Sequence, residues 1–254
     1  MTPSLRLSAI LIAKDEERDL PGCLESLKGL VSEIVVVISD DTTDQTENAA
    51  KRHNAKVSRR KFDDYANMRQ ASLNVAEGDW CLWIDPDERI TKDLADEIKR
   101  ALSVSSPFVA FDIPFRVRFL GREMRWGGLG SESHIRLFRR DKATFTGGAI
   151  HESLILGGPV GRLSGEIIHE PYRDVADYMS KLERYTDLGA QKRFAAGMRF
   201  TVFHHLIYPW ELFSRLILKL GFLDGRPGLT WARLSAYHSW LKYVKLGRMQ
   251  RENT

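Results

Sequence analysis

The sequence predicts an α/β protein with a mostly parallel sheet and a helical C-terminal extension. Residues 1–102 alternate short apolar runs with helical segments of 10 to 12 residues, which implies right-handed βαβ units and a parallel sheet. Residues 108–172 change to short β-like runs separated by glycines, and the residues after Asp174 carry a helical periodicity. We therefore expect two parts, residues 1–172 and residues 173–254.

The strands expected in the first part are short and apolar, as strands buried on both faces of a parallel sheet are. They cover residues 7–13, 34–38, 56–58 and 80–84. Helices are expected over residues 19–30, 43–53, 65–76 and 92–102, where apolar residues recur at helical spacing. Helices are expected in the second part over residues 175–196, 200–220 and 229–246, with a turn at residues 224–228.

Composition and charge exclude several classes of protein. With 254 residues, 43% apolar and 28% charged, the chain is neither disordered, collagenous nor a disulfide scaffold. Its two cysteines, Cys23 and Cys81, lie inside predicted elements, which fits a reducing compartment. The net charge of +4 is uneven: residues 1–100 carry −5, residues 101–172 carry +2 and residues 173–254 carry +7. The acidic first part and the lack of a nucleic-acid-binding motif disfavour a nucleic-acid partner.

The basic second part predicts contact with an anionic membrane surface. Trp210 and Phe213 recur with leucines at helical spacing beside Arg215, and Trp231 and Trp240 do so in the last helix. Basic amphipathic helices with aromatic margins lie in the membrane interface, although the same pattern also suits packing against the first part. Charged residues interrupt the segment 201–222, so we expect no spanning helix there. We also expect no signal peptide, because the first apolar run is short.

Two acidic clusters follow predicted strands, at residues 39–44 and 85–88. Ligands of parallel sheets bind beyond the carboxyl ends of the strands. Asp85 and Asp87 are spaced so that one can bind Mg²⁺ or Mn²⁺ and the other a ribose hydroxyl. Asp40 and Asp41 can accept hydrogen bonds from a base or ribose. The alternative for both clusters is capping of the helix that follows.

Three segments of the first part resemble family 2 inverting glycosyltransferases, which have the nucleotide-sugar-binding, Rossmann-like GT-A fold. They are residues 7–17, 43–46 and 78–88. Four further segments resemble the lipopolysaccharide-core branch of that family, which transfers glucose from UDP-glucose in β-1,4 linkage. They are residues 135–140, 151–152, 158–163 and 221–225. The resemblance covers the chain from about residue 5 to residue 246.

The resemblance implies roles for the acidic residues. The turn with Asp40 and Asp41 would bind uracil and ribose, Asp87 the metal on the diphosphate, and Asp85 the ribose or the metal. Arg69 matches the basic residue of the family's R-N pair and would approach the nucleotide. The chain departs from the family pattern at two places: Ser39 stands at the family's first Asp of D-x-G-S-T-D, and Gln70 at the Asn of the R-N pair.

An inverting transfer needs a base for the acceptor hydroxyl, and a carboxylate also tolerates the positive charge that develops on the sugar. The branch has W-Y-P-D-x-Q ahead of its R-L-F-R run, and Glu132 takes the place of that Asp. Glu132 is therefore the first candidate base, and Glu152 is the second. His151 can complete the metal shell as a neutral imidazole. A solvated or hydrogen-bonded loop is the alternative for all three residues.

Arg136 and Arg139 are candidates for holding the departing diphosphate, because guanidinium groups pair bidentately with phosphates. Both belong to one predicted strand, and we expect them on one face of it; ordinary surface arginines are the alternative.

Together these features predict a metal-dependent hexosyltransferase, with residues 1–172 as its catalytic domain and residues 173–254 facing the acceptor and the membrane. The resemblance favours UDP-glucose as donor and a lipopolysaccharide-core or other lipid-linked glycan as acceptor, at the cytoplasmic face of a bacterial inner membrane. The alternatives are a polyprenyl-phosphate or cell-surface-polysaccharide glycosyltransferase with another nucleotide sugar, and a non-catalytic nucleotide- or glycan-binding scaffold.

Overall fold

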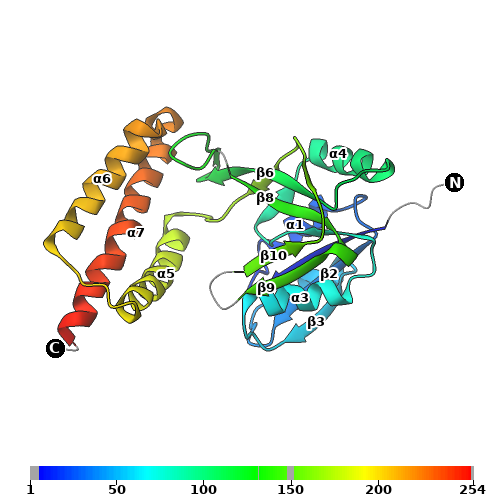
Figure 1. The fold of residues 1–254 in the computed structure, drawn as a ribbon, viewed down its shortest axis with the longest axis horizontal. Helices are drawn as coiled ribbons and strands as arrows, with labels where there is room; N and C mark the ends of the chain where they lie inside the picture. The colour runs from blue at the N-terminus through cyan, green and yellow to red at the C-terminus, as the bar shows by residue number, and fades with distance from the viewer. Residues whose placement is uncertain (1–5, 131, 148–151, 253–254) are drawn as a thin grey trace. The chain divides into compact units, whose positions relative to one another are not determined.

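The computed structural model describes residues 6–130, 132–147 and 152–252, without the side chain of Glu152. The chain divides into two compact units. Unit 1 comprises residues 1–115 and 132–169, and unit 2 comprises residues 116–131 and 170–254. Figure 1 shows the fold and labels several elements of each unit.

Unit 1 is built on a mixed sheet in the strand order β3-β2-β1-β4-β8-β6-β12-β5. The first four strands in this order pair in parallel. β8 then runs antiparallel between β4 and β6, and β12 pairs antiparallel with β5. The strands are β1 (Leu7–Ala13), β2 (Glu33–Ser39), β3 (Lys56–Arg60), β4 (Trp80–Trp83), β5 (Glu88–Ile90), β6 (Ala110–Phe119), β8 (Ser133–Arg139) and β12 (Ile167–His169).

Shorter strands complete this sheet and add a hairpin. β7 (Arg122–Glu123) and β11 (Val160–Arg162) pair with β6. β9 (Ala143–Gly147) and β10 (Glu152–Leu156) form a separate antiparallel pair. The α/β class with a parallel first half, as the alternating pattern predicts, is confirmed.

Two apolar cores lie on the two sides of the sheet. One contains buried residues of α1 (Leu20–Ser26), α2 (Thr46–Arg52) and α4 (Lys92–Ser103), and the other contains Leu73 of α3 (Tyr65–Val75) with Phe145 of β9. Successive residues of β1 and β4 alternate between the cores, because side chains along a strand point to opposite faces. Helix α3 begins where the Asp64 side chain accepts the N–H of Asn67, and α4 begins where Thr91 accepts that of Leu94.

Unit 2 packs around its longest helix. α7 (Gly225–Glu252) lies between α5 (Val175–Ala195) and α6 (Ile207–Phe213) in Figure 1. Its core joins Val117 and Phe119 from the end of β6 to Tyr178 and Leu182 of α5 and Leu241 of α7. Unit 2 therefore holds residues 116–131 together with the C-terminal helices.

The C-terminal helices differ in extent from the predicted ones. Residues 225–228 of the expected turn at 224–228 form the first turn of α7, where Pro227 costs no helical hydrogen bond because the first N–H groups have no partner within a helix. The single helix expected over residues 200–220 is instead a 3-10 turn (Val202–Leu206), α6 and a π turn (Ser214–Leu218). A 3-10 turn (Gly221–Asp224) then leads into α7. No helix among the described residues is both long and apolar enough to cross a bilayer.

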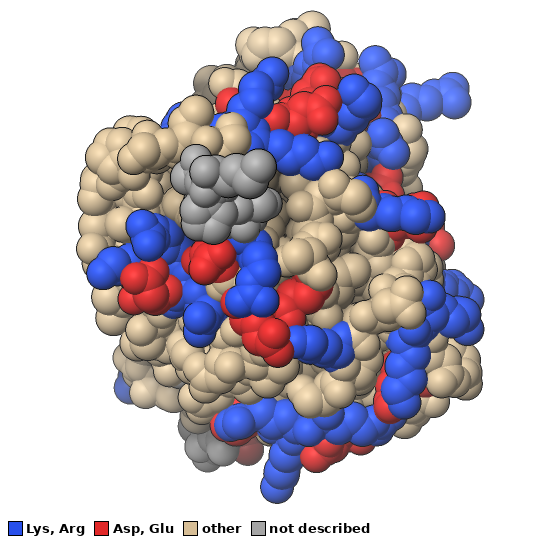
Figure 2. All heavy atoms as spheres, turned by 90° about the vertical axis from the view of Figure 1, so that its right-hand side faces the viewer, with Lys and Arg blue, Asp and Glu red and all other residues tan. Residues whose placement is uncertain are grey.

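Acidic and basic side chains are interspersed on the face that Figure 2 shows. Several acidic residues of the first hundred are ion-paired, among them Glu33 with Lys56 at 2.9 Å and Glu47 with Arg59 at 2.7 Å. Both partners of each pair lie within residues 1–100, so these pairs leave the net charge of −5 over that range unchanged.

Candidate functional site

The acidic motif after β4 forms a tight turn beyond the carboxyl end of that strand. β4 is largely buried, and Pro86 has no N–H to continue its ladder. The N–H of Glu88 donates to the carbonyl oxygen of Asp85 at 3.0 Å, which closes the turn before β5 begins. The alternative of helix capping is wrong for this cluster, because Thr91 caps α4.

Two arginines hold the carboxylate of Asp85. Arg69 of α3 contacts Oδ1 at 2.8 Å, and Arg136 of β8 contacts Oδ2 at 3.1 Å. Both guanidinium carbons lie 4.3 Å from the ring centre of Trp83, a cation–π distance. Burial alone would raise the pKa of Asp85, but the two arginines outweigh it and hold this pKa well below its usual range. Asp85 is therefore ionised at any physiological pH.

Glu88 is the most deeply buried carboxylate of the site, at 1% exposure. Its Oε1 accepts from Arg136 at 2.6 Å, and its Oε2 accepts from the N–H of Asp85 at 2.9 Å. Burial, helped by the charge of the neighbouring Asp85, outweighs the charge of Arg136 and raises the pKa of Glu88 to about 7. Arg136 thus bridges two carboxylates. Its Nε and Nη1 atoms are buried and have no hydrogen-bond partner within the described part of the chain.

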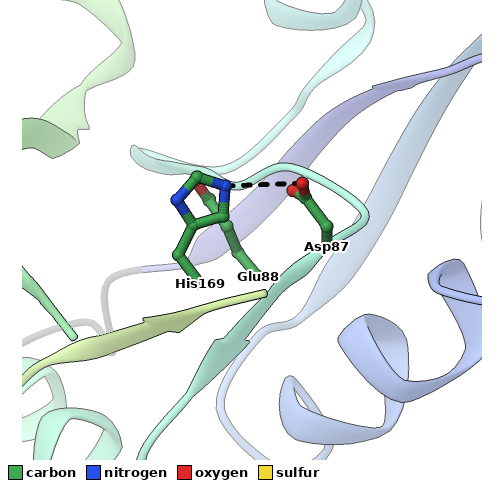
Figure 3. A group of neighbouring side chains, drawn as sticks. All are labelled: Asp87, Glu88 and His169. Carbon is green, nitrogen blue, oxygen red and sulfur yellow. Dashed lines mark ion pairs between the residues drawn. The ribbon is translucent and has the colours of Figure 1, made fainter. Parts of the chain in front are cut away.

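Asp87 lies beside His169, the last residue of β12, and Figure 3 shows both with Glu88. Asp87 Oδ2 is 3.4 Å from His169 Nε2, and one ligand atom from each of the three residues falls within 4.8 Å of the others. Burial lowers the pKa of His169, but the Asp87 contact and the other carboxylates outweigh this effect and leave the pKa raised. The antiparallel register that sets His169 opposite Glu88 creates this group.

The donor set fits a divalent cation. Asp87 and His169 keep 26% and 28% of their side chains exposed, so both can reach an ion and a ligand in solvent. Both oxygens of Glu88 are already engaged, so this residue supports the pair and does not complete the shell. One carboxylate and one imidazole leave coordination positions for phosphate oxygens, as is usual for ions that act on nucleotides.

The second acidic cluster, after β2, is tied to the loop after β1. Asp15 Oδ1 accepts the N–H of Thr43 at 2.9 Å, and Asp44 Oδ2 accepts the N–H of Glu17 at 2.9 Å. Asp41 pairs with Lys14, and hydrogen bonds from Lys14 and Ser39 lower the pKa of Asp41.

The two acidic clusters lie at the same edge of the sheet. β2 and β4 flank β1, so the two turns are about 10 Å apart, two strand spacings. Asp40 and Asp41 are exposed there. The structure therefore brings Arg69, Asp85 and Arg136 together, with Asp40 and Asp41 at the same sheet edge.

The two candidate arginines of β8 lie in different environments. Arg136 is buried against Asp85, whereas Arg139 is exposed and pairs with Asp141 at 3.4 Å. The expectation that the two arginines share one face is wrong, because side chains three positions apart along a strand point to opposite faces. The ladder between β8 and β6 also shifts register between Phe111 and Asp112, opposite Arg136.

The candidate bases lie near the start of β8 and of β10. Glu132 has an exposed side chain, and its carbonyl oxygen accepts the N–H of Phe115 at 2.8 Å. Glu152 begins β10 opposite Gly147, and its side chain is outside the described structure. His151 also lies outside the described residues. His169, which is not among the site residues predicted from the sequence, lies beside Asp87. The second His-Glu pair of the sequence, at residues 169–170, is the local signal for it.

Comparison with known proteins identifies the family. Residues 8–151 match the model of glycosyl transferase family 2. The lipopolysaccharide core biosynthesis glycosyltransferase LpsC of Rhizobium meliloti is 26% identical over 98% of this chain and 97% of its own length. An uncharacterised glycosyltransferase of Rickettsia typhi is 23% identical over 95% of this chain and 86% of its own.

Solved structures are more distant. Staphylococcus aureus TarS residues 1–349, in complex with UDP-GlcNAc, matches with a TM-score of 0.49 and 15% identity over 98% of this chain and 93% of that one. Glucosyl-3-phosphoglycerate synthase of Mycobacterium tuberculosis, with Mn²⁺, UDP and phosphoglyceric acid, matches with a TM-score of 0.41 and 20% identity over 54% of this chain and 56% of that one.

The chain belongs to glycosyl transferase family 2. It has the α/β GT-A fold, with a mixed, mostly parallel sheet followed by C-terminal helices. It is a glycosyltransferase, distantly similar to a lipopolysaccharide core glycosyltransferase.

Proposed function

We propose that this glycosyltransferase transfers a hexose, glucose from UDP-glucose, with inversion onto a lipopolysaccharide-core or other lipid-linked glycan. The observation that carries the proposal is the Asp87–His169 pair beside the arginine-held Asp85, beyond the carboxyl end of β4. A family 2 chain with a cation site at that position is suited to a nucleoside diphosphate sugar. The whole-length similarity to LpsC supports the acceptor class.

Asp87 and His169 would hold Mg²⁺ or Mn²⁺ against the diphosphate. The bound ion would offset the negative charge that develops on the leaving diphosphate. Arg69 and Arg136 add positive charge next to Asp85, and Arg136 retains N–H groups without an acceptor in the described structure. Asp85 would accept a ribose hydroxyl on its remaining lone pairs, and Asp40 and Asp41 would contact the base and ribose.

The base is assigned to the carboxylate of Glu132, with Glu152 second. It would take the proton from the acceptor hydroxyl while that oxygen forms its bond to the anomeric carbon and the bond from this carbon to the diphosphate breaks. The products are the inverted glycoside and UDP. Arg139, paired with Asp141 on the exposed end of β8, would contribute to the diphosphate only if that pair opens.

The protein would associate with the anionic cytoplasmic face of a bacterial inner membrane. The charge of +7 over residues 173–254 supports this proposal, because basic protein surfaces are attracted to anionic lipids.

A binding and turnover experiment tests the function. UDP with Mn²⁺ should raise the melting temperature of the wild type and leave that of Asp87→Ala unchanged. Wild type that fails to respond to any nucleoside diphosphate with either ion would contradict the proposal. Stabilisation without hydrolysis or transfer from any nucleotide sugar would identify a binding scaffold, and turnover only with a polyprenyl-phosphate acceptor or another donor would replace the substrate assignment.

A further inference from the structure

The segment between α5 and α7 carries an uncovered apolar face. Large side chains recur at intervals of three and four residues and remain exposed. We name them the apolar ridge, which consists of Phe203, Leu206, Trp210, Phe213, Ile217 and Leu220. Phe203 is 74% exposed and Trp210 is 61% exposed. Such spacing places Phe203, Leu206, Trp210, Phe213 and Ile217 along one side of the helical run from Val202 to Leu218, and Leu220 follows the end of that run.

The last helix, in contrast, uses its apolar side chains for packing within unit 2. The ring of Trp231 lies 5.5 Å from that of Phe119 and 6.0 Å from that of Tyr178. Leu241 of α7 is buried in the same core. The sequence gives α6 and α7 similar basic amphipathic patterns, but only the segment around α6 leaves its large apolar side chains in solvent.

We infer that the apolar ridge inserts into the interfacial layer of an anionic bilayer. The inference deepens the membrane association proposed above and locates it. Exposed aromatic and aliphatic side chains beside basic residues are the composition of helices that lie in the membrane interface. The helical run from Ile207 to Leu218 is about 18 Å long at 1.5 Å per residue, too short for a hydrocarbon core of about 30 Å. It therefore lies on the bilayer and does not cross it.

The charges around the ridge favour anionic lipid. Residues 188–223 contain five basic residues and one acid, Glu211, which pairs with Arg215 at 3.2 Å. Lys192, Arg199 and Lys219 are exposed. Basic residues near an anionic surface are attracted to it, so charge and apolar insertion act together.

The irregular helix disfavours a second copy of this chain as the occupant. The ridge spacing also matches a heptad pattern, which in a coiled coil requires regular α-helix over several heptads. Here α6 is seven residues long, with a 3-10 turn before it and a π turn after it. These changes in winding prevent knobs-into-holes packing along the whole ridge.

A loop that leads to the proposed base is fastened to the ridge segment. The N–H of Gly127 donates to the carbonyl oxygen of Lys219 at 2.8 Å, and Arg215 donates to that of Gly127 at 3.2 Å. The buried Asp224 accepts the N–H of Trp126 at 2.9 Å. Hydrogen bonds therefore tether residues 125–130 to the ridge segment and to the turn after it, and in the sequence these residues precede Glu132. Insertion of the ridge would hold this loop at the membrane surface, where a lipid-borne acceptor is found.

Vesicle binding tests the inference with the full chain. The probe is a vesicle of phosphatidylcholine containing about one third phosphatidylglycerol, with pure phosphatidylcholine as the comparison. Phe203 and Trp210 are exposed, so the double variant F203S/W210S should fold normally. We expect it to bind the anionic vesicles at least tenfold more weakly than the wild type. The matched control is V104S, because Val104 is 63% exposed and lies in unit 1, and it should bind as the wild type does.

Each other outcome has a defined meaning. Equal vesicle binding by wild type and F203S/W210S would overturn the inference. The inference would also be overturned if neither protein binds vesicles and the wild type sediments as a dimer while F203S/W210S does not. The ridge would then be an interface between two copies of the chain. UDP binding is measured on the same samples. If UDP does not stabilise the wild type but the wild type binds vesicles, this result would contradict the proposed transferase function. The inference that the ridge binds membranes would still hold.

Discussion

Asp87 Oδ2 and His169 Nε2 approach to 3.4 Å although about eighty residues separate the two in the sequence. The contact depends on the pairing of β5 with β12, which places His169 opposite Glu88. The Asp-Pro-Asp motif supplies Asp87 to the proposed cation site, and the register between β5 and β12 supplies His169.

Removal of either member of this pair should weaken metal-dependent nucleotide binding. We expect Asp87→Ala and His169→Ala each to raise the Mn²⁺ concentration needed for UDP to stabilise the protein by at least about tenfold, since changes around metal ligands cost 10- to 100-fold in affinity. Imidazole favours transition ions over Mg²⁺. The Mn²⁺ and Mg²⁺ concentrations needed for UDP to stabilise the protein should therefore differ less in His169→Ala than in the wild type. Thermal shift titrations measure both effects. His53→Ala, which changes a histidine at the end of α2, is the control; unchanged titrations in His169→Ala would contradict the assignment.

Loss of Arg136 should destabilise the fold as well as the site. Arg136→Met leaves the buried Glu88 and the partly buried Asp85 without a shared partner. Breaking a buried ion pair from one side costs about 3–5 kcal/mol, so the free energy of unfolding in urea should fall by about 3 kcal/mol. Arg139→Met, in the same strand but exposed, should change it by less than about 0.5 kcal/mol. Similar stabilities for the two variants would show that the buried arginine is not structural.

Glu88→Gln should be tolerated better than Arg136→Met. Burial raises the pKa of Glu88 to about 7, so its neutral form is accessible near physiological pH, and a glutamine can still accept the N–H of Asp85. We expect a loss of about 1 kcal/mol in urea unfolding at pH 7, about the value of one hydrogen bond. A loss as large as that of Arg136→Met would indicate that the charge of Glu88, and not its hydrogen bond, holds the turn.

The stability of unit 1 should fall in acid through Glu33. Burial would raise the pKa of Glu33, but hydrogen bonds from Ser8, Lys56 and Glu77 lower it to about 2. A carboxyl with a lowered pKa stabilises the folded state above its unfolded pKa of about 4.5, and this contribution is lost as the pH falls toward 2. At about 1.4 kcal/mol per pH unit over about 2.5 units, the contribution is at most about 3.5 kcal/mol, and solvent screening lowers it below this bound.

Urea unfolding between pH 7 and pH 2.5 measures this contribution. Glu33→Gln should be less stable than the wild type at pH 7, and the difference should shrink as the pH falls below 4.5. Glu25→Gln, on an exposed position of α1, is the control. A difference between wild type and Glu33→Gln that stays constant with pH would rule out the ionisation of Glu33 as its source.

The choice between the candidate bases can be decided by turnover with intact donor binding. Loss of a general base costs about 10²- to 10⁴-fold in rate, so Glu132→Gln should lower kcat by at least 100-fold while UDP still stabilises the protein. Glu152→Gln should retain most of its kcat. The opposite pattern, with Glu152→Gln inactive and Glu132→Gln active, would transfer the assignment to Glu152.

The sequence predicts the parts of the fold that depend on local pattern. The apolar runs of β1 and β4 and the acidic turns after β2 and β4 follow from alternation and from the rule about strand ends. His169 was missed, because its place beside Asp87 is set by a pairing between distant strands. Arg136 and Arg139 are three positions apart in one strand, so their side chains point to opposite faces, and the expectation of a shared face is wrong.

The C-terminal part was harder to predict for a related reason. Helical spacing around Trp210 and Trp231 looks alike in the sequence, and only packing distinguishes the uncovered ridge from the buried face of α7. Pro227 and two neighbouring glycines resemble a loop, but the first turn of a helix tolerates them. The assignment of Glu132 as the general base stays a prediction, and so does that of Asp40 and Asp41 to the uracil and ribose.

The late position of β12 has a consequence for synthesis of the chain. A ribosome makes Asp87 first and His169 about eighty residues later, and β12 must then pair with β5 before the two side chains can meet. A nascent chain that ends before residue 169 has the acidic turn without its histidine. If Asp87 and His169 hold the ion as proposed, nucleotide-dependent ion binding would begin only after unit 1 has been translated, and a prematurely terminated product would lack the proposed site.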